Sequence, residues 1–427
     1  MKRDGSDISF GGRKKGRIVS GWKFRVISFF IGLNVVWLAL IKYKNPWRAF
    51  KAAFRVIETR ENFKTNHPKI VKGPDNKYYM NLYTPGWPSE AFDRSIRHAF
   101  NVFSSNLQIS LFSIVFAITH KCGFRCEHCV EWNQLNSKDL LSATDLVQII
   151  RRFQQLGVSQ IQISGGEPMN RLEDILVILD SIPNGIDFWL YTNGYNLTAQ
   201  KAERLKNHGL KGVIISLDDY DGERHDRFRG VRGSFSAAIE SARNVVNSGL
   251  MLAFSCCATN NFVSVRNLIT YVKLCRNAGA SFIQFLEPEA VGRYQNKQVD
   301  LTEINKIRIE QLFRRANFHP SDREYPIISY PAMVKRQNGC PGRGLHYLYV
   351  DADGDVHPCP FCRQKMFSAF ESDLEAKVRS LRNAGCPMSG SSVCSRVSAG
   401  AISTVPADPV DEDKRREFES RMNIPAR

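Results

Sequence analysis

Acidic residues are scarce in the first part of the chain. The first 60 of its 427 residues contain 14 Lys or Arg but only 3 Asp or Glu, and the whole chain carries a formal charge of +17. Most of the positive excess therefore lies in one arm. A basic arm of this kind indicates anionic lipid or nucleic acid as a partner and carries no information about the fold.

The chain also lacks the even cysteine count of a disulfide framework. It has 11 cysteines, and eight of them fall into two groups with cluster-like spacing. Small disulfide-rich secreted classes are therefore excluded, and we expect a reducing compartment. The other three, Cys256, Cys257 and Cys275, lie in apolar patterns typical of core residues.

No small-residue cleavage site follows the long apolar run Val26 to Ile41, which argues against a cleaved signal peptide. Residues 1–25 are polar and basic, and we expect a disordered arm there. A helix over the apolar run would span roughly 24 Å, less than the ~30 Å hydrocarbon core, although mismatch of this size is tolerated. The eight Lys or Arg before the run would also send the rest of the chain outside the cell if it spanned.

An amphipathic helix is predicted next, starting at Asn45 and Pro46. Its aromatic and apolar face carries Trp47, Phe50, Phe54 and Ile57, and its basic face carries Arg48, Lys51 and Arg55. This combination is typical of a helix that lies in the membrane interface. We expect a peripheral or monotopic anchor on the cytoplasmic side of the membrane. The alternative is that both helices pack on the catalytic domain as ordinary core.

Three closely spaced cysteines follow a strand-like run. Ser113 to Thr119 is rich in β-branched and aromatic residues, as in a buried strand, and Cys122, Cys126 and Cys129 come directly after it. Three thiolates at this spacing can hold three irons of a four-iron cluster and leave the fourth without a protein ligand. A structural zinc site is the alternative, but such sites usually pair Cys-x2-Cys units around four ligands.

Strand-like runs then alternate with helical stretches. After the first run they are Gln160 to Ser164, Ile186 to Thr192, Gly212 to Leu217, Leu250 to Cys257 and Ser281 to Leu286. Six strands in this pattern predict an α/β fold with a parallel sheet and right-handed crossovers. In barrel-like folds of this kind, the loops at the carboxyl ends of the strands build the site.

The stretch Cys122-Gly-Phe-Arg-Cys126-Glu-His-Cys129 resembles the signature of the radical S-adenosylmethionine (radical SAM) superfamily. The resemblance, over roughly residues 110–395, implies a partial (β/α)6 TIM-like barrel, a [4Fe-4S] cluster and S-adenosylmethionine. It further implies an enzyme that cleaves S-adenosylmethionine reductively, and a low-potential electron donor such as flavodoxin or ferredoxin. His128 stands where the family often places an aromatic residue or His beside the adenine.

The resemblance also assigns residues that follow the later strands. The segment that meets the methionyl amino group in the family resembles Gly165, Gly166, Glu167 and Pro168 of this chain. The glycines allow the backbone to approach the ligand, and the Glu167 carboxylate can balance the positive charge of the ammonium group. Asn193, Ser216, Asp218 and Asn261 lie where family members approach the ribose, carboxylate or adenosyl group. Each taken alone is an ordinary turn. No hydrogen donor or acid/base is assigned; Glu287, Glu289 and Arg293 face either the barrel mouth or solvent.

A second cysteine group lies near the end of the chain and comprises Cys340, Cys359, Cys362, Cys386 and Cys394. Leu345 to Val356 reads as a β-hairpin with a tight turn at Asp353-Gly354. The segment resembles the SPASM or twitch extension of radical SAM enzymes. This implies one auxiliary [4Fe-4S] cluster held by the first three cysteines, with Cys386 or Cys394 as the candidate fourth ligand. The alternative is a zinc ribbon.

These features divide the chain into six parts: a basic arm with membrane-associated helices (1–60), a linker or substrate-facing region (61–110), the barrel (111–290), a connecting insertion (291–339), the cluster-binding extension (340–396) and a charged tail (397–427). The expected substrate is a lipid or another membrane-associated molecule. One alternative is maturation of a peptide or partner protein, for which residues 1–110 show no recognition pattern. The other alternative is a non-catalytic metal-binding protein whose basic arm binds nucleic acid. Residues 165–168 argue against it, because they would have no purpose in such a protein.

Overall fold

The computed structural model describes residues 15–63, 68–104, 111–340, 342 and 346–383. A sheet of ten strands forms its centre, with strand order β10-β9-β8-β7-β6-β5-β4-β11-β12-β13. The strands are β4 (Ser113–Ala117), β5 (Gln160–Ser164), β6 (Asp187–Thr192), β7 (Gly212–Ser216), β8 (Met251–Cys257), β9 (Phe282–Leu286), β10 (Ile327–Ser329), β11 (Tyr347–Val350), β12 (Asp355–His357) and β13 (Phe367–Ser368). The six predicted strands, β4 to β9, are all present.

Two further strands extend the parallel part of this sheet beyond the six predicted ones. β10 pairs in parallel with β9, and β11 pairs in parallel with β4, whereas β12 and β13 are antiparallel. The predicted hairpin is confirmed as β11 and β12. Residues 291–339, expected to be only a connection, thus contribute β10, whose three residues are too short for periodicity to reveal.

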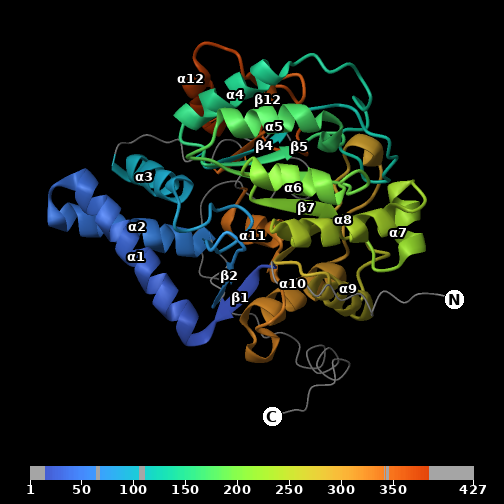
Figure 1. The fold of residues 1–427 in the computed structure, drawn as a ribbon, viewed down its shortest axis with the longest axis horizontal. Coiled ribbons are helices and arrows are strands. Elements are labelled where there is room, and N and C mark those ends of the chain that lie inside the picture. The colour runs from blue at the N-terminus through green and yellow to red at the C-terminus, as the bar shows by residue number, and fades with distance from the viewer. Residues whose placement is uncertain (1–14, 64–67, 105–110, 341, 343–345, 384–427) are drawn as a thin grey trace.

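Helices surround the sheet on one face (Figure 1). They are α4 (Ala143–Gln155), α5 (Leu172–Ser181), α6 (Ala199–Asn207), α7 (Gly222–Arg229), α8 (Ser234–Ser248), α9 (Val265–Asn277), α10 (Glu303–Phe318), α11 (Pro331–Asn338) and α12 (Leu374–Asn383), with 3-10 turns at Pro168–Arg171, Gly292–Tyr294 and Pro320–Asp322. The predicted start of α4 is confirmed, because Ser142 and Asp145 form a reciprocal capping box. Its inner stripe, including Ile149 and Phe153, is buried against the sheet.

A separate unit precedes the barrel. It contains β1 (Arg17–Ser20), α1 (Gly21–Tyr43), α2 (Pro46–Phe63), β2 (Lys69–Lys72), β3 (Tyr78–Tyr79) and α3 (Glu90–Ser104). The three strands form an antiparallel sheet. The expectation of a disordered arm up to residue 25 is therefore wrong for residues 17–25. Ile18 and Val19 form a strand because they pair with Val71 and Ile70, and sequence periodicity cannot show so distant a partner.

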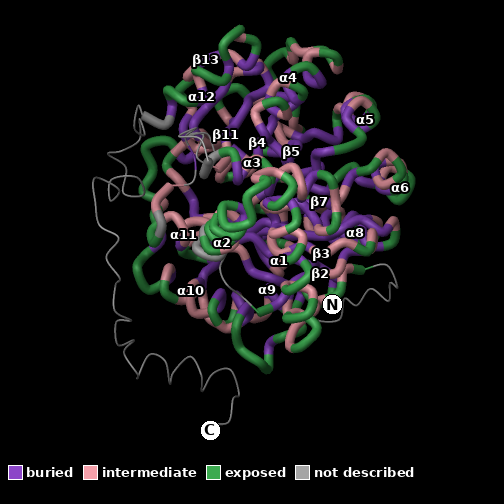
Figure 2. Tube along the Cα trace, turned by 90° about the vertical axis from the view of Figure 1, so that its left-hand side faces the viewer, coloured by how far each residue is buried: buried purple, intermediate pink, exposed green. Residues whose placement is uncertain are grey.

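The first two helices form a hairpin that α3 closes (Figure 1). Their shared core contains Ile31, Val35, Leu38 and Ala39 of α1, Ala49, Ala53 and Val56 of α2, and Phe92, Ile96, Ala99 and Phe100 of α3. α2 therefore packs through small residues and Val56, while its predicted apolar face, with Trp47, Phe50 and Phe54, stays exposed (Figure 2). α1 has 23 residues instead of the 16 expected, and by length and composition it is able to cross a membrane.

The segment after α2 crosses the inner face of the barrel sheet, opposite the helices. Val71, Tyr79 and Leu82 pack there against Trp189, Phe282 and other residues of the barrel strands. The backbone N–H of Gly86 donates to Asp187 at 2.9 Å, and the amide of Gln160 donates to the Leu82 carbonyl at 2.8 Å. This segment thus forms one wall of the space inside the barrel.

Candidate active site

A cavity of about 790 Å³ occupies the inner side of the barrel, at the carboxyl ends of its strands. Its lining includes five of the predicted metal ligands, Cys122, Cys126, Cys129, Cys340 and Cys359. It also includes six of the predicted cofactor-binding residues, Gly165, Gly166, Pro168, Asn193, Ser216 and Asp218. The fold therefore brings the two predicted cysteine groups to one space, although more than 200 residues separate them in the chain.

Backbone hydrogen bonds hold the loop that carries the first three cysteines. The N–H groups of Gly166 and Glu167 donate to the carbonyls of Thr119 and Lys121, each at 2.7 Å. On another side, the N–H of Glu127 donates to the Phe228 carbonyl at 2.9 Å, and the N–H of Arg293 donates to the Cys129 carbonyl at 3.0 Å. The loop is thus fixed from three separate parts of the barrel.

Glycine is required where the β5 loop approaches the cysteine loop. A Cβ on Gly165 would lie 2.6 Å from the Thr119 carbonyl oxygen, and one on Gly166 would lie 2.5 Å from that of Lys121. Gly165 also has φ of +140°, which side-chain-bearing residues rarely adopt. The two glycines therefore allow one backbone to lie directly against the other and leave the cavity side open.

The chemistry of the cysteine set fits an iron-sulfur cluster. Burial raises the pKa of the Cys122 thiol to about 11 and that of Cys129 to about 12, so the bare thiols hold their protons until a metal displaces them. In the described part of the chain, no three His, Cys, Asp or Glu side chains converge on one point as ligands of a single ion do. A four-iron cluster needs no such point, because each thiolate binds a different iron.

A buried ion pair that the sequence analysis missed lies beside these cysteines. Arg229, the last residue of α7, donates from Nε to Asp218 Oδ2 at 2.5 Å, and its Nη1 lies 3.6 Å from Cys126 Sγ. Asp218 also accepts from the Cys257 N–H at 2.8 Å. Burial alone would raise the pKa of Asp218, but the Arg229 charge lowers it below its usual value. The pair therefore stays charged and places a fixed positive group at the cysteine loop.

Glu167 is held by hydrogen bonds within the protein, and its role toward S-adenosylmethionine stays a prediction. Its carboxylate accepts from the Asn193 and Met169 N–H groups at 2.8 and 3.1 Å and from the Thr192 hydroxyl at 2.7 Å. The side chain is buried and does not line the cavity. It therefore joins the loops after β5 and β6, and its carboxylate is already occupied by hydrogen bonds from the protein.

The remaining predicted residues lie in different places. Asn261 is exposed and lines a neighbouring space of about 400 Å³, not the main cavity. Cys362 is buried beside Cys359, whose carbonyl accepts its N–H at 3.1 Å. Cys386 and Cys394 lie outside the described residues. His128 lines the cavity and stacks on Phe228 with ring centroids 4.8 Å apart, and burial lowers its pKa to about 4.

The C-terminal extension is fastened directly to the cysteine loop. Glu131, at the end of that loop, accepts two hydrogen bonds from the Arg363 guanidinium, at 2.6 and 3.0 Å, and one from the Tyr349 hydroxyl. His120 lies 3.2 Å from Asp353 in the β11–β12 turn. Cys340 and Cys359 are thereby held at a set position relative to Cys122, Cys126 and Cys129.

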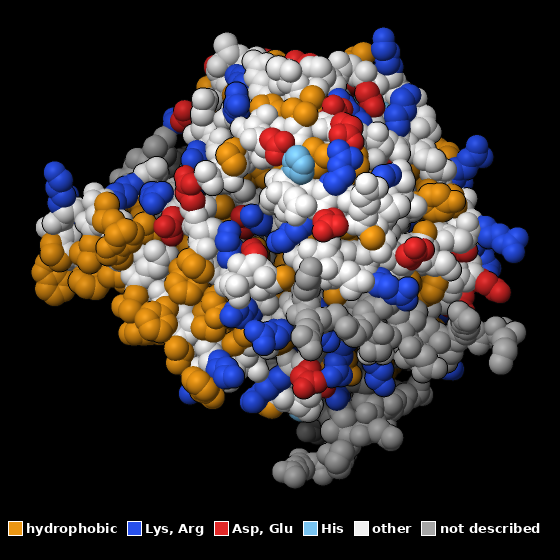
Figure 3. All heavy atoms as spheres, viewed as in Figure 1, with side chains coloured by type: hydrophobic (Ala, Val, Ile, Leu, Met, Phe, Trp, Pro, Cys, Tyr) orange, Lys and Arg blue, Asp and Glu red, His pale blue; other side chains and the backbone are white. Residues whose placement is uncertain are grey.

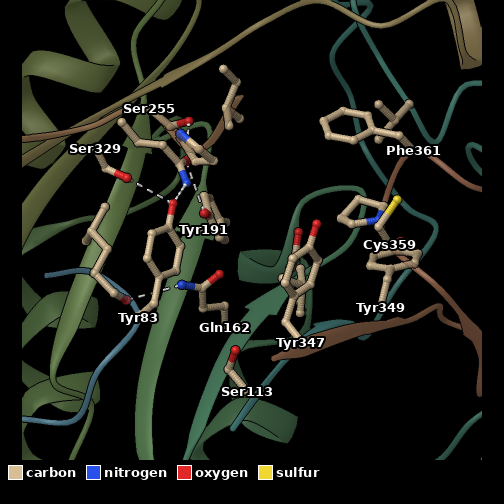
Figure 4. A pocket seen from close by; sticks show the side chains of 18 of the residues that line it. Tyr83, Ser113, Gln162, Tyr191, Ser255, Ser329, Tyr347, Tyr349, Cys359 and Phe361 are labelled. Atoms are coloured by element: carbon tan, nitrogen blue, oxygen red, sulfur yellow. Dashed lines mark hydrogen bonds between the residues drawn. The ribbon is translucent and has the colours of Figure 1, made fainter. Parts of the chain in front are cut away.

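Along the barrel strands, the cavity wall is polar but uncharged. Gln284 donates to the Tyr83 hydroxyl at 2.5 Å and accepts from the hydroxyls of Tyr191 and Ser255 at 3.1 and 2.9 Å. Ser329 donates to Tyr83 at 3.3 Å, and Ser113, Gln162 and Tyr347 complete this wall (Figure 4). We call these eight residues the neutral wall. Sequence patterns could not find it, because Tyr83 comes from the N-terminal unit and the others from separate strands.

Of the three charged residues noted after the sixth strand, two line the cavity. Glu287 is paired with Arg336 at 2.6 Å, whereas the Glu289 carboxylate lies close to Lys335 and accepts no hydrogen bond from the described residues. Burial raises the pKa of Glu289 to about 7, with Lys335 opposing that shift. Arg293 lies outside the main cavity, where it contacts the Trp132 ring.

Comparisons with known proteins agree with this geometry. Residues 116–258 match the family profile described as the Radical SAM superfamily. The chain is 31% identical over 180 residues to the GTP 3′,8-cyclase of Aliarcobacter butzleri, covering 40% of this chain and 54% of that protein. It is 23% identical to the sporulation killing factor maturation protein SkfB of Bacillus subtilis, covering 65% and 66%. The first curated relatives are thus matched over only about one third to two thirds of their length.

A solved structure shares the fold. Streptococcus suis SuiB bound to the precursor peptide SuiA superposes with a TM-score of 0.55 at 17% sequence identity, covering 88% of both chains. The match includes a partial barrel with a mostly parallel sheet, as described above. Family cofactors are a [4Fe-4S] cluster and S-adenosylmethionine, and the cysteine loop, the Gly165–Gly166 approach and the cavity fit both. By its cysteine motif and the family match, the segment of residues 116–258 is a radical SAM domain, and the fold of the described chain agrees with this.

Proposed function

We propose that this protein is a radical SAM enzyme that modifies an unactivated carbon of a peptide or protein substrate. The observation that carries the proposal is the single cavity that joins the cysteine loop, the neutral wall and the cysteines of the extension. When bound, a [4Fe-4S] cluster and S-adenosylmethionine supply a 5′-deoxyadenosyl radical that abstracts hydrogen from carbon.

The chain's own residues would prepare the site for that chemistry. Cys122, Cys126 and Cys129 would hold three irons, and the glycines of the β5 loop would allow S-adenosylmethionine to approach the backbone. The Asp218–Arg229 pair beside Cys126 would keep a positive charge next to an anionic cluster. The N-terminal segment and the extension close two sides of the cavity and so exclude water from a reactive centre.

The neutral wall supports a peptide substrate. Its hydroxyl and amide groups can both donate and accept hydrogen bonds, which matches the backbone amides of an extended peptide. The relatives point the same way, since SkfB is named as a maturation protein and SuiB was solved with its precursor peptide. The folded unit of residues 17–104 also supplies a further surface beside the cavity, where sequence analysis finds no recognition pattern.

Cys340, Cys359 and Cys362 would hold an auxiliary [4Fe-4S] cluster. Cys340 and Cys359 line the cavity. Burial, and after it the charge of the nearby Cys340, raises the pKa of the Cys359 thiol to about 12. A fourth ligand from Cys386 or Cys394 stays a prediction. We also propose a cytoplasmic location, in keeping with the nine described cysteines, all of which are free thiols.

A lipid or other membrane-borne substrate is the second candidate. Val56 of α2 and Ser95 and Ala99 of α3 line the cavity, so the helical unit with the exposed apolar face also forms part of the substrate space. The comparisons give this candidate no support. Turnover assays with peptide and with lipid extracts would separate the two, because 5′-deoxyadenosine formation rises when the true substrate is added.

The first test is iron and sulfide content together with electron paramagnetic resonance on anaerobically reconstituted protein. The wild type should hold two clusters, and Cys122→Ala/Cys126→Ala/Cys129→Ala should lose one and form no 5′-deoxyadenosine. S-adenosylmethionine should perturb the spectrum of the wild type only. Cys275→Ala, which removes a buried cysteine away from the cavity, is the matched control. Zinc in place of iron, with no response to S-adenosylmethionine, would contradict the proposal.

A further inference from the structure

Apolar side chains cover one outer face of the hairpin formed by α1 and α2. Large exposed hydrophobic residues number 18 in the described chain, and 11 of them lie between residues 22 and 54. They are Trp22, Val26, Phe29, Phe30, Leu33, Trp37, Leu40 and Ile41 of α1 and Trp47, Phe50 and Phe54 of α2. Figure 3 shows hydrophobic side chains gathered over these two helices on the left of the view. We call these 11 residues the apolar patch.

The patch exists because α1 is apolar on two opposite sides. Ile31, Val35 and Leu38 form the stripe that packs on α2 and α3. Phe29, Leu33 and Trp37 lie about half a turn of the helix away from that stripe and point outward. A helix that is apolar all round needs a cover on every side. Packing within the described chain supplies a cover for one side only.

Helix α2 repeats this arrangement and adds charge. Trp47, Phe50 and Phe54 follow one another at helical spacing along its exposed side, with fractional exposures of 84%, 53% and 68%. Arg48, Lys51 and Arg55 form the adjacent exposed stripe. From residue 15 to residue 57 the chain contains nine Lys or Arg and no Asp or Glu. Within this stretch, every charged side chain is therefore basic.

We infer that the apolar patch docks on the surface of an anionic lipid bilayer. Three of the chain's six tryptophans lie in the patch, and tryptophan is favoured at the boundary between headgroups and acyl chains. The basic stripe would meet anionic headgroups while the aromatic stripe enters the boundary. A protein partner with an acidic rim would need an apolar face of matching shape, whereas a bilayer accepts a broad convex patch.

The structure favours docking over spanning. α1 packs against α2 and α3 through its buried stripe. Strand β1, which comes directly before α1 in the chain, pairs with β2 and fixes the start of the helix. Crossing a membrane would pull Ile31, Val35 and Leu38 out of that core. We therefore place α1 and α2 in the plane of the membrane surface, next to the helical wall of the cavity.

The test is flotation of the full-length protein with two kinds of vesicles. One contains phosphatidylcholine alone, and the other an equal mixture of phosphatidylcholine and phosphatidylglycerol. The wild type should float with the anionic vesicles, and added salt should weaken that binding. Arg48→Glu/Lys51→Glu/Arg55→Glu should weaken it by about 100-fold, since each cation near an anionic surface contributes about fivefold or more. Arg232→Glu/Arg266→Glu/Arg314→Glu, also exposed, is the matched control.

A second variant tests the apolar contribution. Trp37→Ser/Trp47→Ser should weaken vesicle binding by roughly 100-fold, or about tenfold for each large side chain withdrawn from the boundary. Leu140→Ser/Val177→Ser removes exposed apolar residues elsewhere and should bind like the wild type. Because all four positions are exposed, thermal unfolding should stay unchanged and should exclude misfolding as the cause.

Two results would overturn the inference. The first is binding to neither kind of vesicle, together with a dimer in analytical ultracentrifugation that Trp37→Ser/Trp47→Ser converts to a monomer, which would make the patch an interface between two copies. The second is vesicle binding that resists salt and both variants. Neither result depends on the cofactors or on the substrate, so the outcome is separate from that of the proposed function.

Discussion

The two ends of the cavity hold their polar groups in different ways. At the cysteine loop, Asp218 and Arg229 are both charged and both almost fully buried, with side-chain exposures of 3% and 9%. Along the neutral wall, Tyr83, Gln284 and Tyr191 are linked by hydrogen bonds between uncharged groups. A buried charged pair thus lies at the end that would hold an anionic cluster, whereas the neutral wall contains no charged side chain. The end left for substrate offers neutral hydrogen-bonding groups, which can be exchanged for those of a ligand at low cost.

The largest effect should come from breaking the buried ion pair. Arg229→Met would leave Asp218 charged and unpaired in the interior, which should lower the free energy of unfolding by about 3–5 kcal/mol. Arg224→Met removes a comparable contact to Asp219 from an arginine that is 44% exposed, and should cost at most about 1 kcal/mol. Chemical denaturation of both variants measures the difference. Equal losses would show that burial does not distinguish the two pairs.

A smaller loss is expected where the extension meets the cysteine loop. Glu131→Gln keeps the shape of the side chain but removes the charge that accepts from Arg363 and Tyr349. We expect about 1.5–3 kcal/mol of destabilisation, the range for hydrogen bonds to charged groups. The auxiliary cluster should also lose iron more readily on chelation. Glu375→Gln, at an exposed pair with Arg379, is the control. Unchanged stability and iron retention would argue against a coupling between the two cysteine groups.

The neutral wall should respond in activity more than in stability. Gln284→Leu would leave the hydroxyls of Tyr83, Tyr191 and Ser255 without their shared partner, at a cost of about 1–3 kcal/mol. If the wall binds substrate, KM should rise while the uncoupled cleavage of S-adenosylmethionine without substrate stays the same. Tyr83→Phe should reproduce the change in KM with a smaller loss of stability. A fall in uncoupled cleavage would instead place the wall at the cofactor.

The narrowest effect concerns Glu289, because it is confined to one range of pH. Because its pKa is raised to about 7 in the folded protein, the stabilising contribution of the protonated form is complete below about pH 4.3 and is lost as pH rises toward 7. Glu289→Gln does not titrate. Relative to the wild type, this variant should therefore gain about 3 kcal/mol between those two values. Denaturation curves across this range measure the gain, and Glu240→Gln, an exposed change on α8, should show none.

The sequence predicts the barrel well because each strand leaves a local pattern. The apolar runs from Ser113 to Leu286 give all six strands, and the cysteine loop follows directly from its spacing. Arg229 was missed because it lies among other charged residues in α7, and only the folded chain shows that it is the buried one. Tyr83 was missed because its partner Gln284 is 201 positions away. Local patterns cannot report such distant contacts.

In the N-terminal unit, too, the local sequence pattern does not report the contacts between elements. The sequence pattern predicts that Trp47, Phe50 and Phe54 form one face of a membrane helix, and they do share one exposed face. It does not foresee that Ala49, Ala53 and Val56 would attach that helix to α1 and α3, because small residues give little hydrophobic periodicity. The pattern identified the outer surface correctly but not the packing that supports it.

The parallel pairing of β11 with β4 affects how the chain is made. Strand β4, at Ser113 to Phe116, pairs with β11, at Tyr347 to Val350. During synthesis, β4 therefore has no partner on this edge until about 230 more residues have been added. At a synthesis rate of about 5–20 residues per second, that delay is roughly 10 to 50 seconds. During this time β4 presents an open edge that can pair with other chains. On the ribosome, this edge is a natural place for a chaperone to protect the nascent protein.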